Sequence, residues 1–228
     1  MIGISPRCPL CGDATSHFSL KTGKSAIGYH RCETCGFIGM EPSDMPCPDD
    51  EKARYLLHSN LASNAGYMEF LKAFIDKTLT PYKQPGAKVL DFGSGPSPLL
   101  AESVNSMGYR CDLYDPFFAP SRAWETRHYD AILLHEVAEH LHDPGSVLSV
   151  VAERVMGGGI IAIRTRFMPE AARDFQTWWY RMDRTHVSFF SASCLQKFFE
   201  LRGFTILLLE KPDILVFEHA RYKDLSWS

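Results

Sequence analysis

The feature that most limits the possible folds of this chain is an alternation of apolar runs and amphipathic segments after residue 87. The predicted strands are KVLDF, YRCDLYD, DAILL and IIAIRT, and helical spacing of apolar residues marks 97–108, 145–155 and 193–202. Such alternation is typical of a parallel sheet with helices on both faces. The chain then adds TILLLE and DILVFEH, two strands that a tight turn makes antiparallel. The sequence therefore predicts an α/β fold.

The length and composition are those of a globular domain with a small appendage. The 228 residues are 45% hydrophobic and carry a formal net charge of −3. This charge lacks the basic excess expected for nucleic-acid binding and favours a small, neutral or weakly charged substrate. No apolar run approaches the ~18 residues that span a bilayer, and MIGISPRCPL lacks the pattern of a secretory signal. We expect a cytoplasmic protein without membrane or nucleic-acid partners; the oligomeric state stays open.

Four of the seven cysteines form two C-x₂-C pairs, which are Cys8 with Cys11 and Cys32 with Cys35. Two such pairs separated by twenty residues are the ligand pattern of a tetrahedral Cys₄ zinc site. The segment between them reads as a hairpin with a turn near Gly23, which makes residues 1–45 a zinc ribbon with structural Zn²⁺. The alternative is two redox pairs or incidental thiols.

Residues 46–85 read as a Pro- and Asp-rich linker followed by helices with a break near residue 64, and residues 86–228 form the main domain. Within that domain, the strand VLDF leads into the glycine turn Gly93-Ser94-Gly95. Pro98 replaces the third glycine of the dinucleotide fingerprint, so no diphosphate is expected. Asp115 ends the next predicted strand, where a carboxylate accepts hydrogen bonds from ribose hydroxyls. The sequence thus predicts a ligand with a ribose, and the alternative is a purely structural turn.

Several motifs in succession resemble those of one family. VLDFGSGPSPLL, LYDP, YDAILLHEVAEHLHDP and a Met-Gly-Gly-Gly turn before IIAIRT are similar to the motifs of class I S-adenosylmethionine-dependent methyltransferases, over residues 88–217. The resemblance implies a Rossmann-like, seven-stranded, mostly parallel sheet with a reversed last strand. By position, it implies that S-adenosyl-L-methionine contacts Tyr55, His58, Asp91, Gly93, Ser94, Gly95, Asp115 and Pro116. Trp124 or Glu125 would replace the family's acidic residue at the third strand.

The segment HEVAEHLHDPG, residues 135–145, is a near match to the zinc-protease motif H-E-x-x-H. His135 and His140 are five residues apart, so on a helix they diverge by about 140° and cannot bind one metal. Glu136, Glu139 and His140 would share a helix face. This E-x-x-E-H pattern resembles the O-methyltransferases of ubiquinone synthesis, in which it is associated with a divalent cation. We therefore expect Mg²⁺ or Mn²⁺ binding, acid–base or substrate contacts, or a structural role.

A second polar cluster occupies FQTWWYRMDRTHVSFFS, residues 175–191. Its Trp178, Trp179 and Tyr180 could form a lid or stack on a substrate, and the alternative is plain packing. Methyl transfer to a hydroxyl or ammonium requires removal of a proton. The candidate bases are His135, His140 and His186.

The expected function is transfer of a methyl group from S-adenosylmethionine to a small molecule by in-line displacement. O-methylation is favoured, and N- or C-methylation are alternatives. A different hypothesis is that the zinc ribbon docks to RNA or a protein partner, with that macromolecule as the methyl acceptor.

Overall fold

The structure is a computed structural model that describes residues 7–22, 25–57 and 64–221. The expected hairpin turn at Gly23 and the candidate cofactor contact His58 lie outside these residues. Within the described ranges, no helix is long and apolar enough to cross a membrane.

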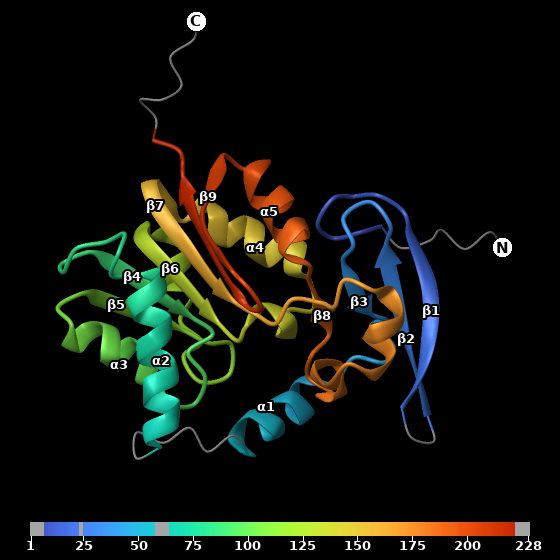
Figure 1. The fold of residues 1–228 in the computed structure, drawn as a ribbon. Helices are drawn as coiled ribbons and strands as arrows, with labels where there is room; N and C mark the ends of the chain where they lie inside the picture. The colour runs from blue at the N-terminus through green and yellow to red at the C-terminus, as the bar shows by residue number, and fades with distance from the viewer. Residues whose placement is uncertain (1–6, 23–24, 58–63, 222–228) are drawn as a thin grey trace, which may run out of the picture.

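A six-stranded mixed sheet forms the centre of the larger part of the molecule (Figure 1). Its strands are β4 (Lys88–Phe92), β5 (Arg110–Tyr114), β6 (Tyr129–His135), β7 (Val155–Arg164), β9 (Phe204–Glu210) and β10 (Ile214–His219). They lie in the order β5-β4-β6-β7-β10-β9. The first four are parallel, and β10 is antiparallel to both of its neighbours. The predicted antiparallel pair at the end of the chain is confirmed.

The expected seventh strand is not among the described residues. It would lie beside β5, but only residues 115–128 connect β5 to β6, and they form a short 3₁₀ helix, η1 (Arg122–Thr126), and an isolated bridge. A single crossover between parallel strands needs a dozen or more residues. The connection is therefore too short to hold an extra strand with a crossover on each side.

Helices cover both faces of this sheet, as the alternation predicted (Figure 1). One face packs against α4 (Pro144–Glu153) and α5 (Ala192–Glu200), and the other against α2 (Ala65–Thr78) and α3 (Leu99–Ser106). Adjacent strand residues alternate between the two cores: Leu90 faces α4 and α5, whereas Val89 faces α2 and α3. The remaining helix, α1 (Pro48–Leu57), precedes α2.

The predicted turn at Met156-Gly-Gly-Gly is instead part of β7. Gly158 has φ +76°, and the pairing of β6 with β7 shifts register between Tyr129 and Ala131. The glycines therefore form a bulge at the start of the strand, which permits the left-handed conformation without ending the sheet.

The N-terminal segment forms a second sheet that includes a strand from far along the chain. Its strands are β1 (Thr15–Thr22), β2 (Ser25–Cys32), β3 (Ile38–Met40) and β8 (Ser188–Phe189), in the order β1-β2-β3-β8. The segment between β7 and β8, with 3₁₀ helices η3 (Ala172–Thr177) and η4 (Trp179–Met182), packs on the same sheet. The boundary at residue 45 remains a prediction, since the ribbon shares both strand pairing and core with the main domain.

Candidate active site

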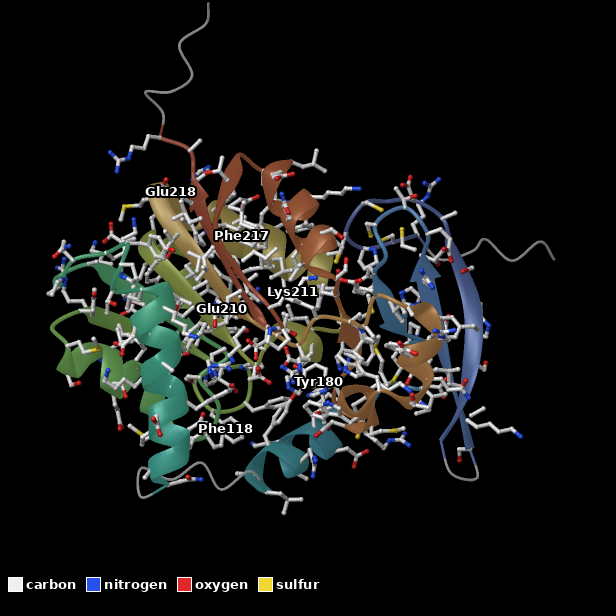
Figure 2. The ribbon with its side chains drawn as sticks, in the orientation of Figure 1. Phe118, Tyr180, Glu210, Lys211, Phe217 and Glu218 are labelled. Carbon is white, nitrogen blue, oxygen red and sulfur yellow. The ribbon has the colours of Figure 1, made fainter. Side chains whose placement is uncertain are left out.

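A cavity of about 1230 Å³ opens at the carboxyl ends of β4, β5 and β6. This edge is where open α/β sheets bind ligands. The sequence-predicted residues that line the cavity are Tyr55, Gly93, Ser94, Gly95, Asp115, Pro116, Trp124, Glu125, His135, Glu136, Glu139, His140, Trp179 and His186. Tyr180 also lines it, from the segment between the large sheet and the ribbon (Figure 2).

The glycine turn at the end of β4 forms one wall of the cavity. Gly93 has φ +82°, and a Cβ there would lie 2.5 Å from the Val137 side chain. Gly95 has φ +64°, and its N–H donates to Asp115 Oδ2 at 2.9 Å. Glycine is therefore required at position 93 for both conformation and space.

Asp115 follows β5 and faces the same wall. Its Oδ1 accepts from the N–H groups of Phe117 and Phe118, at 2.8 and 3.0 Å. Each carboxylate oxygen can accept two hydrogen bonds, so Oδ2, which accepts only the one from Gly95, keeps acceptor capacity. Asp115 fits the predicted ribose contact and additionally holds the loop after β5, a role that sequence patterns did not indicate.

Asp91, by contrast, is buried beneath the turn and does not line the cavity. It is 2% exposed, and its Oδ2 has no hydrogen-bond partner. Burial raises the pKa of this carboxyl to about 7. The Gly93–Gly95 backbone and Asp115 do line the cavity and fit a bound S-adenosylmethionine, whereas a cofactor contact of Asp91 stays a prediction.

Aromatic side chains line the wall beyond Asp115. The rings of Phe92, Tyr114 and Trp124 lie 5.0 to 5.1 Å apart, in edge and tilted contacts. Trp124 is buried and comes from η1, whereas Glu125 forms an ion pair with Arg122. Of the two residues considered for the adenine side, Trp124 therefore offers an apolar surface.

The loop after β6 is not the helix that the E-x-x-E-H interpretation assumed. Glu136 has φ +56°, and only Ala138–His140 form a 3₁₀ turn, η2. Such a φ is uncommon for a residue with a Cβ. The single helix face predicted for Glu136, Glu139 and His140 is therefore absent.

Tyr180 joins the two glutamates of this loop. Its hydroxyl donates to Glu139 Oε1 at 2.5 Å and lies 3.4 Å from Glu136 Oε2. Burial, followed by the nearby charge of Glu139, raises the pKa of Glu136 to about 8. Glu139 is fully buried, its pKa is also raised by burial, and its Oε2 has no hydrogen-bond partner.

Two of the candidate histidines lie beside this pair. The Nδ1 atoms of His140 and His186 lie 2.8 and 2.7 Å from backbone carbonyl oxygens. A carbonyl only accepts, so in the neutral ring Nδ1 carries the proton and Nε2 does not. Candidate ligand atoms of Glu139, His140 and His186 lie within 4.8 Å of one another. The possible metal set therefore contains His186 in place of Glu136.

His135 has a different environment from the other two histidines. Its ring lies 5.0 and 4.8 Å from those of Phe70 and Phe74, and burial lowers its pKa to about 3. A base that weak is poorly matched to a reaction near neutral pH.

An ion pair that sequence reasoning did not predict joins α1 to the segment before β8. Arg54 donates to Asp183 Oδ2 at 2.8 Å, and both residues line the cavity. Burial would raise the pKa of Asp183, but Arg54 and the Thr185 N–H and hydroxyl hold it well below its usual range. The partners are 129 residues apart, so no local pattern could reveal the contact.

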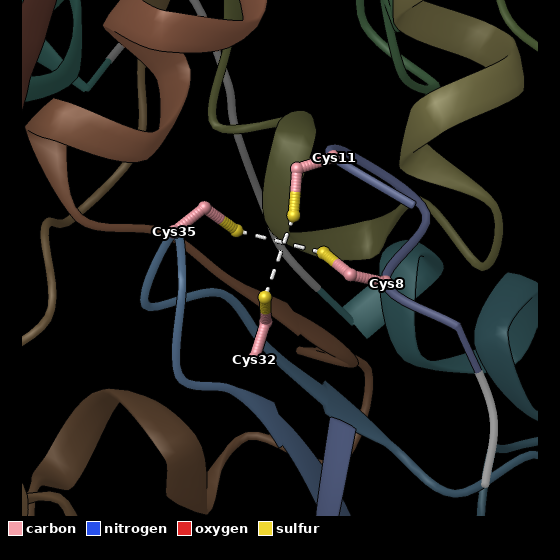
Figure 3. A group of neighbouring side chains, drawn as sticks. All are labelled: Cys8, Cys11, Cys32 and Cys35. Carbon is pink, nitrogen blue, oxygen red and sulfur yellow. Dashed lines mark hydrogen bonds between the residues drawn. The ribbon is translucent and has the colours of Figure 1, made fainter. Parts of the chain in front are cut away.

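The four predicted zinc ligands gather at the end of the ribbon (Figure 3). The sulfur atoms of Cys8 and Cys35 are 3.5 Å apart, and those of Cys11 and Cys32 are 3.4 Å apart. Tetrahedral zinc with ~2.3 Å bonds places its sulfurs about 3.8 Å apart. The four thiols thus fit Zn²⁺, while Cys47, Cys111 and Cys194 lie outside the group.

Comparison with known proteins agrees with this geometry. A family model described as a methyltransferase domain matches residues 63–209, more than half of the chain. The chain belongs to this family. It therefore contains a methyltransferase domain. No curated protein matches the sequence.

Solved structures show the same fold at low sequence identity. An O-methyltransferase family protein from Burkholderia thailandensis is 15% identical with a TM-score of 0.56, over 79% of this chain and 65% of that one. TnmH is 18% identical with a TM-score of 0.51, over 75% and 60%. The pyocyanin biosynthetic protein PhzM is 16% identical with a TM-score of 0.50, over 76% and 59%. The chain thus spans about three-fifths of the length of these proteins.

Proposed function

We propose that this enzyme transfers a methyl group from S-adenosylmethionine to a hydroxyl of a small molecule. The observation that carries the proposal is one cavity with two dissimilar ends. One end holds the glycine turn and Asp115, and the other holds Tyr180, Glu139 and His186. A cofactor end beside a proton-accepting end is what methyl transfer to a hydroxyl requires.

Bound S-adenosylmethionine would supply a methyl group on a sulfonium leaving group. The Asp115 carboxylate would accept hydrogen bonds from the ribose, and Trp124 would cover the adenine side. Gly93 and Gly95 let the backbone lie against the methionine part, and Tyr55 closes the cavity from α1. His58, also implied as a cofactor contact, stays a prediction.

We assign the general base to His186. Its Nδ1–H donates to the Tyr180 carbonyl, which leaves Nε2 to take a proton from the acceptor hydroxyl. Burial lowers the pKa of His186, so the neutral base predominates at neutral pH. His140 lies beside it, with ring centroids 4.8 Å apart, and we assign it to orientation of the acceptor.

A small molecule suits this cavity better than a macromolecule. Glu139 is fully buried and Tyr180 is 4% exposed, so the reacting groups lie at the bottom of an aromatic cavity. An oxygen acceptor is favoured because carboxyl, phenol and imidazole groups converge there, and nitrogen or carbon acceptors are the alternatives. Methylation of RNA or of a protein docked to the ribbon is the competing hypothesis.

A divalent metal at Glu139, His140 and His186 is a second candidate role for this cluster. The clustering of these three donors favours it. Two imidazoles and one carboxylate suit Zn²⁺, Mn²⁺ or Fe²⁺ better than Mg²⁺, which prefers oxygen ligands. In that case the metal would acidify the acceptor hydroxyl directly.

The cofactor part of the proposal is tested by binding of S-adenosylhomocysteine. We expect the saturating product to raise the melting temperature of the protein. Asp115→Ala should weaken the affinity of the protein for S-adenosylhomocysteine at least tenfold, as measured by calorimetry. Glu102→Ala, on the exposed face of α3, should leave this affinity unchanged. Absence of any shift with the wild-type protein would refute the assignment.

The acceptor part is tested by the fate of a labelled methyl group. Label from S-adenosylmethionine should enter a pool of small hydroxylated molecules. Label found only in RNA or protein would support the docking hypothesis instead. Loss of turnover with a chelator that spares the ribbon metal, restored by Mn²⁺ or Zn²⁺, would identify the second metal site.

A further inference from the structure

Strand β8 connects the ribbon to the catalytic loop, residues 135–142. On one edge it pairs with β3, and the Met40 N–H donates to the Val187 carbonyl at 2.8 Å. On the other edge the Val187 N–H donates to the Glu139 carbonyl at 2.8 Å, and Ser188 Oγ donates to the Leu141 carbonyl at 2.7 Å. His186 directly precedes Val187 in the chain. β8 therefore lies between β3 of the ribbon and the catalytic loop.

The cysteine knuckles determine the position of β3. The Cys32 N–H donates to the Phe37 carbonyl at 2.9 Å, and the Gly36 N–H donates back to the Cys32 carbonyl at 2.9 Å. Phe37, next in the chain, packs against Phe190 just after β8, with ring centroids 5.5 Å apart. Displacement of the second knuckle would thus move β3 and its partner β8 together.

The first knuckle packs directly against the start of α4, the helix that follows the catalytic loop. A Cβ on Gly145, at the start of α4, would lie 1.9 Å from the Pro9 carbonyl oxygen. Pro9 lies between the two cysteines of that knuckle. Real Cβ contacts are never so short, so this glycine permits a backbone approach that any side chain would prevent.

Neither the ribbon nor the segment before β8 has a core of its own. Ile27, Tyr29, Ile38 and Met40 of the ribbon form one buried cluster with Phe175, Tyr180, Val187 and Phe189. Tyr180 belongs to this cluster by its ring and to the active site by its hydroxyl. A sheet of this size is not stable without a metal or another support.

We propose that the Cys₄ centre is a positioning element of the acceptor end of the active site. Metal bound there holds β3, and through β8 it holds His186, Tyr180 and the loop that carries Glu139. The hydrogen bonds of the cofactor end run to the large sheet instead, since the Gly93 and Ser94 N–H groups donate to the Tyr114 carbonyl and the Gly95 N–H donates to Asp115. The inference rests on the proposed roles of His186 and Glu139, but its structural part can be tested without any acceptor.

Hydrogen exchange of the full-length protein tests this link. The zinc-loaded protein is compared with protein from which the metal has been removed by a chelator under reducing conditions. We expect the amides of Met40 and Val187 to exchange at least tenfold faster without metal, while those of Val89 and Leu133, which face the opposite side of the large sheet, do not change. S-adenosylhomocysteine affinity should change less than twofold.

Two outcomes would overturn the proposal. Unchanged exchange at Val187 would show that β8 does not depend on the metal. Equal loss of protection in the large sheet, with loss of S-adenosylhomocysteine binding, would show a general stabilising role. If the wild-type protein failed to bind S-adenosylhomocysteine even with zinc, the proposed function would fail while the exchange result remained valid.

Gly145→Ala tests the same link without altering a cysteine. The added methyl group must push the first knuckle away from α4, and Gly66→Ala on α2, with no close neighbour besides Asn64, is the matched control. With cobalt in place of zinc, we expect both variants to keep the thiolate-to-cobalt absorption band and cofactor affinity. Methyl transfer should fall about tenfold only in Gly145→Ala. Wild-type turnover in Gly145→Ala would contradict the proposal, as would an equal fall in cofactor affinity.

Discussion

At the scale of single residues, burial changes the protonation chemistry of the groups around the cavity. Burial raises the pKa of Glu136 to about 8, so at neutral pH this carboxyl is mostly protonated and can donate a hydrogen bond. His186 is shifted in the opposite direction, because burial penalises its charged form. The acceptor end thus combines a neutral carboxylic acid with a neutral imidazole. Such a pair can donate to one acceptor oxygen while removing a proton from another.

This arrangement predicts the pH dependence of the reaction. The protonated imidazole of His186 cannot accept a proton, so activity should rise as the ring deprotonates. Because its pKa is lowered, the rising limb of kcat should lie below the usual histidine value of about 6.5. His186→Asn should lose the limb and about 10²-fold or more in kcat. His135→Asn should keep the limb, and a limb that follows His135 would contradict the assignment.

At the scale of elements, sequence patterns predicted those parts that depend on local periodicity. The strands of the large sheet, the helices on both faces and the antiparallel pairing of β9 with β10 follow from apolar spacing and turn length. The prediction of a helix for the catalytic loop was wrong. The left-handed conformation of Glu136 and the hydrogen bond between Glu139 and Val187 depend on tertiary contacts, which local patterns do not show. The family resemblance implied a seventh strand beside β5. The described residues hold no such strand, because the connection from β5 to β6 is too short for it.

The glycine turn offers a prediction at the same scale. Gly93→Ala combines an unfavourable positive φ with a contact of 2.5 Å to Val137. Gly86→Ala is a matched control, because Gly86 has φ +91° and nothing within 4 Å of its Cβ. In both variants the free energy of unfolding, measured with urea, should fall by about 1–2 kcal/mol, because alanine disfavours a positive φ. Only Gly93→Ala should also weaken S-adenosylhomocysteine binding, by tenfold or more. Equal binding by the two variants would show that the turn does not contact the cofactor.

At the scale of the whole molecule, the ribbon is part of the same folded unit as the methyltransferase domain. Cys8, Cys32 and Phe37 belong to one buried cluster with strand residues of the large sheet and with Phe190. The C-x₂-C spacing predicted the metal ligands, but the strand that joins them to the active site comes from residues 188–189. Two residues carry too little periodicity to be recognised as a strand. The integration of the two parts therefore became visible only in the folded chain.

A shared core predicts cooperative unfolding of the metal-loaded protein. The cobalt–thiolate band reports the ribbon, and far-ultraviolet circular dichroism is dominated by the larger domain. We expect the two thermal transitions to coincide, because exposing the ribbon side of Phe37 and Phe190 also exposes the core under α5. Cys47→Ser, at an exposed thiol outside the cluster, should not change either midpoint. Loss of the cobalt band several degrees before the circular dichroism transition would show that the ribbon unfolds alone. In that case a metal-dependent link to His186 would operate only below the lower of the two temperatures.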